Sequence, residues 1–288
     1  MSYQSTLQAG SFNNRNIIVT GGGSGIGRCT AHELASLGAN VFLIGRNKEK
    51  LQTVKDEILA DGGQAVFFCC DIRQEADVKD LVDKIIHQYG AIDGLVNNAG
   101  GQFPAPLSKI SKNGWDAVIS TNLTGGFLMA REVFNQSMSK SGGSIVNIVA
   151  DMWGGMPGMG HSGAARAGMA NFTQTAAYEW GHAGVRVNAV APGWIASSGM
   201  DTYPDDFKVV LKSLKKAVPL GRLGNEAEIS STLCFLLSDA ASYISGTVIR
   251  VDGAASQGNT AIYPLKEAEN LKPFKGFHRE VEPELFKE

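Results

Sequence analysis

The stretch Thr20-Gly21-Gly22-Gly23-Ser24-Gly25-Ile26-Gly27 decides the fold of this chain. The apolar run 16–19 before it predicts a buried strand, and residues 28–35 after it predict a helix. Glycines at a strand-to-helix turn let the backbone approach a pyrophosphate, and the helix N-terminus offers N–H groups and a partial positive charge. The spacing therefore predicts a dinucleotide site, with a plain flexible turn as the alternative; the expected contacts are Gly21, Ser24, Gly25, Ile26 and Gly27.

Strand-like and helix-like segments alternate from here to residue 251. Short apolar runs predict further strands at 41–44, 65–70, 93–96, 144–149, 185–190 and 247–251. Amphipathic spacing predicts helices at 47–60, 74–89, 113–140 (with an irregular start), 163–181 and 226–237. Continuous apolar strands separated by amphipathic helices predict an α/β fold of the Rossmann type, a doubly wound parallel sheet in three α/β/α layers.

The alternation predicts a single domain over residues 1–256, which includes a polar N-terminal extension. The pattern breaks after Gly253, and residues 257–288 form a charged tail with Pro264, Pro273 and Pro283. Such a tail is either an arm over a neighbouring subunit or a partly disordered segment.

Composition narrows the choice of partners. The chain has 288 residues, is 43% hydrophobic and carries a net charge of -2, so nothing in its charge favours nucleic acid or an anionic membrane. It has no run of 18 apolar residues and no signal-peptide core, which predicts no membrane span and a cytoplasmic location. Its four cysteines lack CxxC spacing and a histidine cluster, so we expect neither a metal site nor a disulfide framework.

Arg46 follows the second predicted strand, where an NAD-specific site carries an acidic residue for the ribose 2′-hydroxyl. An arginine can instead bind a 2′-phosphate through two hydrogen bonds, and Lys48 lies close in sequence. A cation here opposes the dipole of the following helix, and a ligand role would explain it. We therefore predict NADP(H) as the cofactor, with a solvated pair of charges as the alternative.

Two further strand ends supply candidate contacts to the adenosine half of the cofactor. Asp71, with Ile72 beside it, can accept a hydrogen bond from the adenine amino group or cap the next helix. The turn Asn97-Asn98-Ala99-Gly100 offers amides and small residues that suit close contact with ribose, although it is equally an ordinary turn. The predicted contacts from these turns are Asp71, Ile72, Asn98, Ala99 and Gly100.

These motifs, together with Asn122 in a long helix and Pro192-Gly193 after the sixth strand, resemble the short-chain dehydrogenase/reductase superfamily over residues 14 to 253. In that family the Pro-Gly turn binds the nicotinamide carboxamide. The resemblance therefore implies cofactor contacts from Pro192, Gly193, Ile195 and Ser197. Residues 198–220 are similar to the family's mobile substrate lid.

The family's catalytic set is only partly present. It normally combines a Ser, a Tyr-x-x-x-Lys and an Asn; the tyrosine is the acid/base and the lysine holds the ribose. Asn122 is retained, whereas Ser162 falls at the tyrosine position and Arg166 at the lysine position. Arginine can still hold ribose hydroxyls, but a serine is a poor replacement for an ionisable phenol. The usual route of alcohol oxidation is therefore not supported by these residues.

A narrower resemblance covers residues 98–103, 121–125 and 161–168, which look like segments of 2,4-dienoyl-CoA reductases and peroxisomal trans-2-enoyl-CoA reductases. These enzymes reduce a C=C bond conjugated to a thioester, so they stabilise an enolate. In the dienoyl-CoA group a serine commonly precedes the basic residue by four, as Ser162 does here, and some members take their acid from a tyrosine in the preceding loop. Asp151 occupies that place.

The resemblance therefore predicts four catalytic residues: Asn122, Asp151, Ser162 and Arg166. Asp151 would hold a water that delivers the proton, with His161 as a second candidate and Tyr203 of the lid in reserve. The alternatives are that Asp151 is an ordinary loop residue and that His161 faces solvent at a helix start.

The predicted loops carry several large apolar side chains, which suggests a cleft for an acyl or isoprenoid chain, although core packing accounts for some of them; they are Met152, Trp153, Met156, Met159, Trp194 and Met200. Three functions stay open. The favoured one is an NADP(H)-dependent reductase of an enoyl- or dienoyl-CoA; the others are a dehydrogenase of a long-chain or terpenoid alcohol, and a cofactor-binding protein without turnover. Small residues along the helix at 163–181 and the family's interfaces imply a homotetramer.

Overall fold

The computed structural model describes residues 2–258, 264–265 and 272–287. In this part of the chain seven parallel strands form one sheet in the order β3-β2-β1-β4-β5-β6-β7. The strands are β1 (Asn16–Thr20), β2 (Asn40–Gly45), β3 (Gln64–Cys69), β4 (Gly94–Asn97), β5 (Gly143–Ile148), β6 (Val185–Pro192) and β7 (Val248–Val251). The order reverses at β1, which lies between β2 and β4, and such a switch point opens a crevice at the carboxyl ends of the strands.

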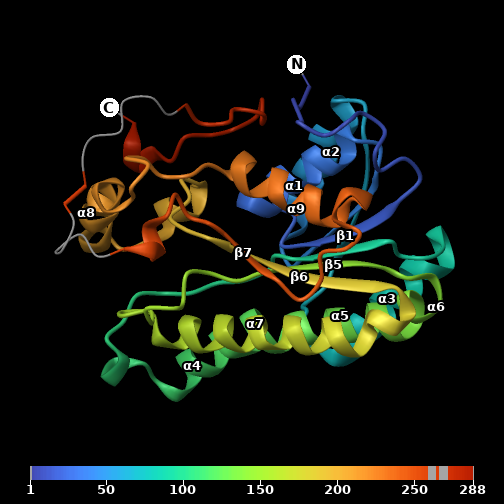
Figure 1. The fold of residues 1–288 in the computed structure, drawn as a ribbon, viewed down its shortest axis with the longest axis horizontal. Coiled ribbons are helices and arrows are strands. Elements are labelled where there is room, and N and C mark those ends of the chain that lie inside the picture. Colours follow the sequence, from blue (N-terminus) through green and yellow to red (C-terminus); the bar gives the residue numbers. More distant parts are fainter. Residues whose placement is uncertain (1, 259–263, 266–271, 288) are drawn as a thin grey trace.

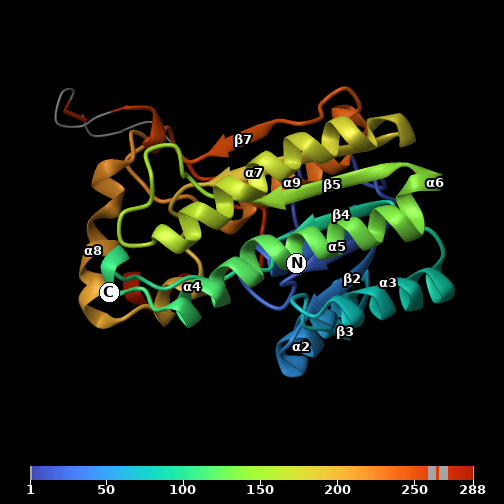
Figure 2. The same ribbon diagram turned by 90° about the horizontal axis from the view of Figure 1, so that it is seen from below.

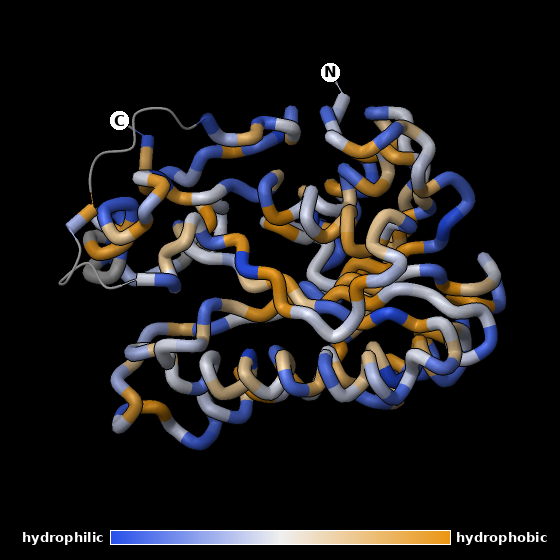
Figure 3. Tube along the Cα trace, viewed as in Figure 1, coloured by the Kyte–Doolittle hydropathy of each residue, from blue (hydrophilic) through white to orange (hydrophobic). Residues whose placement is uncertain are grey.

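Helices cover both faces of the sheet (Figures 1 and 2). One layer holds α1 (Gly25–Ser36), α2 (Lys48–Ala60) and α9 (Glu226–Leu237); the other holds α3 (Glu75–Tyr89), α5 (Gly125–Val133) and α7 (Gly160–Trp180). Apolar residues gather along the sheet between the layers (Figure 3). Alternate β1 residues face opposite layers, with Val19 packed in the cluster that includes Leu34 and Ile18 in the cluster that includes Met129. The structure thus confirms the predicted single-domain Rossmann-type fold.

The long helix predicted at 113–140 is interrupted at two places within its length, and not only at its start. It consists of α4 (Lys112–Ile119), α5 and α6 (Ser139–Ser141), which are joined by π-helical turns at Ser120–Thr124 and Phe134–Met138. A π-turn inserts one residue into the helix and is common at functional sites. Here the first of them carries the buried Asn122.

The helix predicted at 163–181 begins earlier, at Gly160. His161 and Ser162 therefore lie in its first turn, and both side chains are buried. The alternative that His161 faces solvent at a helix start is wrong, because the added turn directs the side chain inward. Similarly, α1 begins at Gly25 rather than at residue 28.

The lid region contains a 3₁₀ turn at Ser198–Thr202, the helix α8 (Asp205–Ser213) and a second 3₁₀ turn at Leu214–Ala217. It lies beyond the carboxyl ends of the strands, as Figure 1 shows. Among the described helices none is long and apolar enough to cross a membrane.

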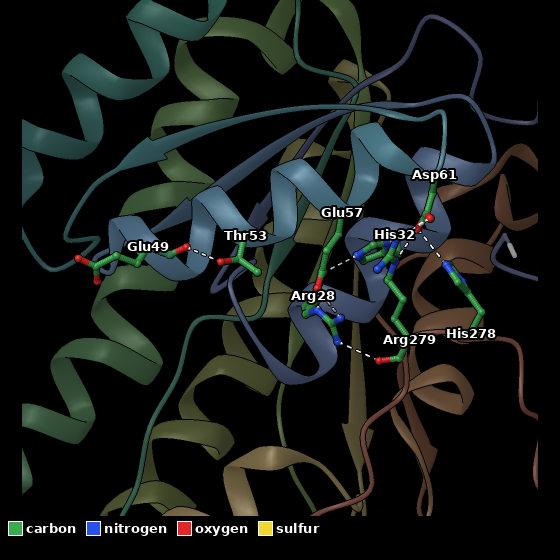
Figure 4. Close-up of polar contacts among 8 residues, drawn as sticks. All are labelled: Arg28, His32, Glu49, Thr53, Glu57, Asp61, His278 and Arg279. Carbon is green, nitrogen blue, oxygen red and sulfur yellow. Dashed lines mark hydrogen bonds and ion pairs between the residues drawn. The ribbon is translucent and has the colours of Figure 1, made fainter.

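In the described part of the C-terminal tail, residues 274–279 pack against the layer of α1, α2 and α9, whereas the N–H groups of Glu284 and Leu285 donate to Asp201 in the lid. Phe277 is buried with Tyr3 and Cys29, so both ends of the chain meet over α1. Asp61, at the end of α2, accepts hydrogen bonds from His278 (2.9 Å) and from both ends of the Arg279 guanidinium (2.7 and 2.8 Å), as Figure 4 shows. The predicted tail also includes residues 259–263, 266–271 and 288, which lie outside the described residues.

Candidate active site

A cavity of about 470 Å³ opens at the carboxyl ends of the strands around the switch point. Its size is typical of a small-molecule site. Seven residues predicted to contact the cofactor line it: Gly21, Ser24, Arg46, Asp71, Ile72, Ala99 and Gly100. The prediction missed several other lining residues, among them Gly23, Asn47, Lys50, Arg73 and Thr121.

The glycine-rich turn forms one wall of the cavity. Gly21 and Gly25 have φ values of +66° and +56°, which side chains rarely adopt. A Cβ at Gly27 would lie 2.4 Å from the Gly21 carbonyl oxygen, so only glycine allows α1 to start this close to β1. Gly27 therefore supports the turn from behind, and Ile26 packs against the core instead of lining the cavity.

The N-terminus of α1 forms part of this wall. Ser24 is the N-cap residue, yet its side chain makes no capping hydrogen bond, and the first turn contains no acidic residue. The partial positive charge and the N–H groups of this helix end are suited to a pyrophosphate. The residues present thus fit the phosphate part of a dinucleotide.

Cationic side chains also line the cavity, next to the glycine-rich turn. Arg46 is exposed at the end of β2, and Lys50 joins it on the first turn of α2, where Asn47 accepts a hydrogen bond from the Lys50 N–H (2.8 Å). The predicted companion of Arg46, Lys48, does not line the cavity, because its helical position turns it away. An exposed arginine and lysine beside this cavity form a suitable site for an extra phosphate.

Asp71 lies at the far end of the cavity and is held by Arg73. The Arg73 Nε donates to Asp71 Oδ1 (2.8 Å), and the Arg73 backbone N–H donates to the same oxygen (3.1 Å). The Arg73 guanidinium holds the pKa of Asp71 below its usual range, and burial opposes this effect. Asp71 is therefore a fixed, ionised acceptor at the place where the adenine amino group is expected.

Asn98 does not line the cavity but ties β4 to β1. Its Nδ2 donates to the Thr20 carbonyl oxygen (2.9 Å), and its backbone N–H donates to Thr20 Oγ1 (3.0 Å). The Ala99 N–H donates to the same hydroxyl (3.0 Å). The turn is thus held rigidly, and Ala99 and Gly100 form the floor of the cavity.

Asn122 and Arg166 meet beside Gly100. A Cβ at Gly100 would lie 2.5 Å from Arg166 Nη2 and 3.0 Å from Asn122 Oδ1, so a glycine is required here. Arg166 Nη1 donates to the Ile148 carbonyl oxygen (2.6 Å). Burial lowers the pKa of Arg166 to about 10, so this side chain stays a cation at neutral pH.

Both ends of the Asn122 amide bind the backbone of Gly101. Asn122 Oδ1 accepts from the Gly101 N–H (2.8 Å), and Nδ2 donates to the Gly101 carbonyl oxygen (3.0 Å). The π-turn that carries Asn122 thus fixes the loop after β4.

Ser162 is not isolated at the tyrosine position. Its hydroxyl donates to Gln102 Oε1 (2.6 Å), and Gln102 Nε2 donates to the phenol oxygen of Tyr203 in the lid (3.1 Å). Gln102 was not predicted as a site residue, although its position directly after Asn98-Ala99-Gly100-Gly101, in the loop after β4, was a usable signal. Three segments far apart in sequence therefore meet through one amide.

The neighbouring His161 has a fixed tautomer. Its Nδ1 accepts the Ser162 N–H (2.9 Å), so the ring proton is on Nε2. The Phe103 ring stands at 90° to the imidazole with the centroids 4.4 Å apart. Asp151 lies in the loop after β5, partly buried, and among the described residues no hydrogen bond joins it to Ser162, Asn122 or Arg166.

The turn after β6 approaches the site from the other side. The Gly193 N–H donates to the Val251 carbonyl oxygen (3.0 Å) and continues the pairing that ends at Pro192. Ile195 forms a parallel bridge with Gly224. The hydrogen bonds of this bridge come from the peptide groups of the two residues that flank Ile195, so the N–H and carbonyl groups of Ile195 itself point away from Gly224. Ser197, at the start of the lid, accepts the Met200 N–H (2.9 Å).

The six apolar loop residues do not gather in one cleft. Trp194 lines a separate cavity of about 140 Å³ together with Val218 and Leu220 of the lid. Trp153 instead lies under the Arg250 guanidinium, 3.7 Å from the ring centroid. Two more, Met159 and Met200, are buried.

Comparison with known proteins gives the family. A family model described as enoyl-(acyl carrier protein) reductase matches residues 21–256. A crystal structure of a short chain dehydrogenase from Bacillus anthracis superposes with a TM-score of 0.77 at 38% identity, covering 85% of this chain and 98% of that one. The chain belongs to the short-chain dehydrogenase/reductase family. Members of this family are oxidoreductases that use nicotinamide cofactors.

Two other family members differ in what their names say. A probable 2,4-dienoyl-CoA reductase from Bacillus subtilis is 40% identical over 240 residues, which cover 82% of this chain and 94% of the relative. The structure of a citronellol catabolism dehydrogenase (AtuB) from Pseudomonas aeruginosa is 60% identical with a TM-score of 0.81, and the match covers 88% of this chain and 100% of that one. A 3-oxoacyl-[acyl-carrier-protein] reductase FabG from Staphylococcus epidermidis is 36% identical over 83% of this chain and 98% of the relative, so the comparisons agree on the family and leave the substrate open.

Proposed function

We propose that this chain is an NADP(H)-dependent reductase of a C=C bond conjugated with a thioester, as in an enoyl- or dienoyl-CoA. The observation that carries the proposal is the pair Ser162 and Arg166 at the places of the family's tyrosine and lysine. The Ser162 hydroxyl proton is donated to Gln102, so it does not serve as the acid that carbonyl reduction needs. Reduction of a conjugated C=C bond instead requires a site that stabilises the enolate oxyanion and a group that protonates a carbon atom.

The cavity supports the cofactor part of the proposal. Arg46 and Lys50 would bind the 2′-phosphate, the N-terminus of α1 would bind the pyrophosphate, and Asp71 would accept from adenine. When bound, the cofactor supplies the hydride. The bridge at Ile195 would present peptide groups to the carboxamide, together with the Ser197 hydroxyl.

The proposal gives each catalytic residue a role. Arg166 would hold the nicotinamide ribose and place a positive charge near the enolate, and Asn122 would hold the loop after β4. Ser162 would orient Gln102. The proton would come from Asp151 through a water, or from a group of the lid. A homotetramer and a cytoplasmic location belong to the same proposal.

A second candidate is a dehydrogenase of a terpenoid alcohol or aldehyde. The AtuB structure favours it, because citronellol is a branched terpenoid alcohol. Trp194, Val218 and Leu220 would offer apolar contacts to part of an isoprenoid chain, although Arg222, Glu228 and Asp252 line the same cavity. A branched isoprenoid enoyl-CoA combines the thioester named for one relative with the terpenoid skeleton named for the other, so it belongs in the first assay.

One substrate panel tests the proposal. Purified protein is incubated with NADPH, or separately with NADH, and with a straight enoyl-CoA, a dienoyl-CoA, a branched isoprenoid enoyl-CoA and a terpenoid aldehyde. We expect NADPH oxidation with one or more of the thioesters and a product whose C=C bond is reduced. Turnover of the aldehyde alone would establish the second candidate, and tight NADPH binding without any turnover would leave a cofactor-binding protein.

A further inference from the structure

Tyr203, Gln102 and Ser162 form one hydrogen-bonded chain from the lid to α7. The Ser162 Oγ–Gln102 Oε1 distance is 2.6 Å, and the Gln102 Nε2–Tyr203 Oη distance is 3.1 Å. Ser162 is fully buried and Tyr203 is partly exposed. The chain therefore runs from the interior, at the family's tyrosine position, to a phenol at the edge of the site.

The direction of the two bonds gives Tyr203 a chemical role. Because Ser162 donates to Gln102 Oε1, the amide must present its NH₂ group to Tyr203. The phenol oxygen thus accepts a hydrogen bond, so its own proton points elsewhere. A donor aimed at a phenol oxygen also stabilises the phenolate that forms when the proton leaves.

The amide is held firmly enough to set this geometry. Gln102 follows Gly101, whose N–H and carbonyl oxygen are both bound by Asn122. Asn122 in turn lies in the π-turn and is buried. Asn122 and Ser162 thus fix the backbone and the side-chain orientation of Gln102 respectively.

We propose that Tyr203 is the proton donor of this site and that Gln102 is the positioning residue that holds it there. The inference rests on the proposed function. The alkene carbon farther from the thioester accepts a hydride from the reduced nicotinamide, and the π electrons move to give an enolate. The Tyr203 O–H bond then breaks, its proton forms a C–H bond at the carbon next to the thioester, and the phenolate regains a proton from water.

The test compares Tyr203→Phe with Gln102→Glu. Tyr203→Phe keeps the ring and removes the acid, so kcat should fall by about 10²-fold while KM and the NADPH dissociation constant change little. Gln102→Glu has nearly the same shape and still accepts from Ser162, but it has no N–H for Tyr203 and repels the phenolate. Its kcat should fall by about tenfold or more, and Gln102→Met, which neither donates nor repels, should fall less.

Tyr178→Phe is the matched control, because Tyr178 is 90% exposed on α7 and outside the site. It should leave kcat unchanged. The solvent deuterium isotope effect on kcat should rise in Tyr203→Phe, where water must supply the proton, and a purely structural role would not produce this change.

A second readout needs no substrate. If Gln102 anchors the lid, Gln102→Met and Tyr203→Phe should both accelerate trypsin cleavage at the exposed lid lysines, Lys212, Lys215 and Lys216, several-fold over Tyr178→Phe.

The outcomes separate this inference from the proposed function. Wild type that reduces only the aldehyde overturns the proposed function, and the Tyr203 variant is then measured on that aldehyde. Tyr203→Phe with wild-type kcat on whichever substrate is turned over overturns the inference, as does a larger loss in Asp151→Asn than in Tyr203→Phe. A wild type that turns over nothing overturns both.

Discussion

His32 should make the fold lose stability in mild acid, and the size of the effect follows from its surroundings. It lies on α1 with a side chain only 2% exposed, between Glu57 and Asp61 (Figure 4). The imidazole also packs against the Phe277 ring, with the centroids 5.1 Å apart. Burial lowers the pKa of His32 from its usual 6.5 to about 4, and the hydrogen bond to Glu57 only partly offsets this. The native state therefore keeps a neutral imidazole over a pH range in which the unfolded chain binds a proton.

The sign and the magnitude follow from linkage. A lowered pKa in the native state contributes stability that is fully present above pH 6.5 and is lost as the pH falls toward 4. The difference between a pKa of 6.5 in the unfolded chain and about 4 in the native state corresponds to a loss of about 3 kcal/mol in the free energy of unfolding as the pH falls from above 6.5 to about 4.

Glu226 at the start of α9 acts in the opposite direction over a similar pH range. Burial raises its pKa from 4.5 to about 7, and Arg28 opposes the rise. A raised pKa contributes stability that is present in acid and is lost as the pH rises through about 7. The wild-type curve will therefore be flatter than either group alone would make it, and the His32 effect must be measured as a difference.

The assay is urea unfolding at fixed protein concentration between pH 4 and pH 7.5 for wild type, His32→Gln and the surface control His87→Gln. The free energy of wild type minus that of His32→Gln should fall by about 3 kcal/mol from the neutral to the acid end. His87 is exposed, so the same difference for His87→Gln should be flat. A flat difference for His32→Gln as well would show that the buried neutral imidazole does not control acid stability.

Three other predictions test the cofactor site and the assembly. Arg46→Ala should weaken NADPH binding by roughly 10- to 100-fold and NADH binding little, because only NADPH carries the phosphate that Arg46 would hold; fluorescence titration that gives equal losses would contradict the assignment. Gly27→Ala should abolish binding of both cofactors, because a Cβ 2.4 Å from the Gly21 carbonyl oxygen must displace the turn, and Gly258→Ala, where nothing lies within 4 Å, is its control in the same titration. Light scattering should give four times the 30.5 kDa chain mass, because the exposed small residues Ala164 and Ala167 let α7 of another subunit approach closely; a mass near 30.5 kDa would refute this.

The layers of the fold were predictable because their signals are local. Apolar runs such as Ile17 to Val19 are long enough to mark buried strands, and the glycine turn marks the first strand-to-helix connection. Helix boundaries were less predictable. Gly160 begins α7 although glycine is a poor helix former, because the burial of His161 and Ser162 outweighs intrinsic propensity. The π-turn at Asn122 has no signal in the spacing of apolar residues, since it inserts a single residue into an otherwise regular helix.

The cofactor side of the site could be anticipated in outline, and its details depended on side-chain direction. The cation at Arg46 was recognisable from its place after β2, but whether Lys48 or Lys50 joins it depends on where α2 starts, since two residues along a helix turn a side chain by about 200°. Asn98 was expected to touch the ligand because it follows a strand, yet its amide reaches Thr20. A polar residue at a strand end can serve the neighbouring strand as easily as a ligand, and the sequence does not distinguish these uses.

The proton donor shows most clearly where sequence reasoning stops. The spacing to Arg166 places Ser162 at the tyrosine position and so reveals that a phenol is missing, but it does not reveal what occupies the space. A serine is shorter than a tyrosine by the whole ring, and in this fold the Gln102 amide lies 2.6 Å from its hydroxyl and extends to Tyr203. The phenol that the family carries at position 162 and the phenol of Tyr203 in the lid are therefore alternative acids at the two ends of one short hydrogen-bonded chain. Restoring a phenol at position 162 should make the Tyr203 phenol dispensable. Ser162→Tyr restores it, and Gln102→Gly in the same chain makes space for the ring. In that background Tyr203→Phe should lower kcat far less than in wild type, whereas an equal loss in both backgrounds would mean that Tyr203 acts independently of position 162.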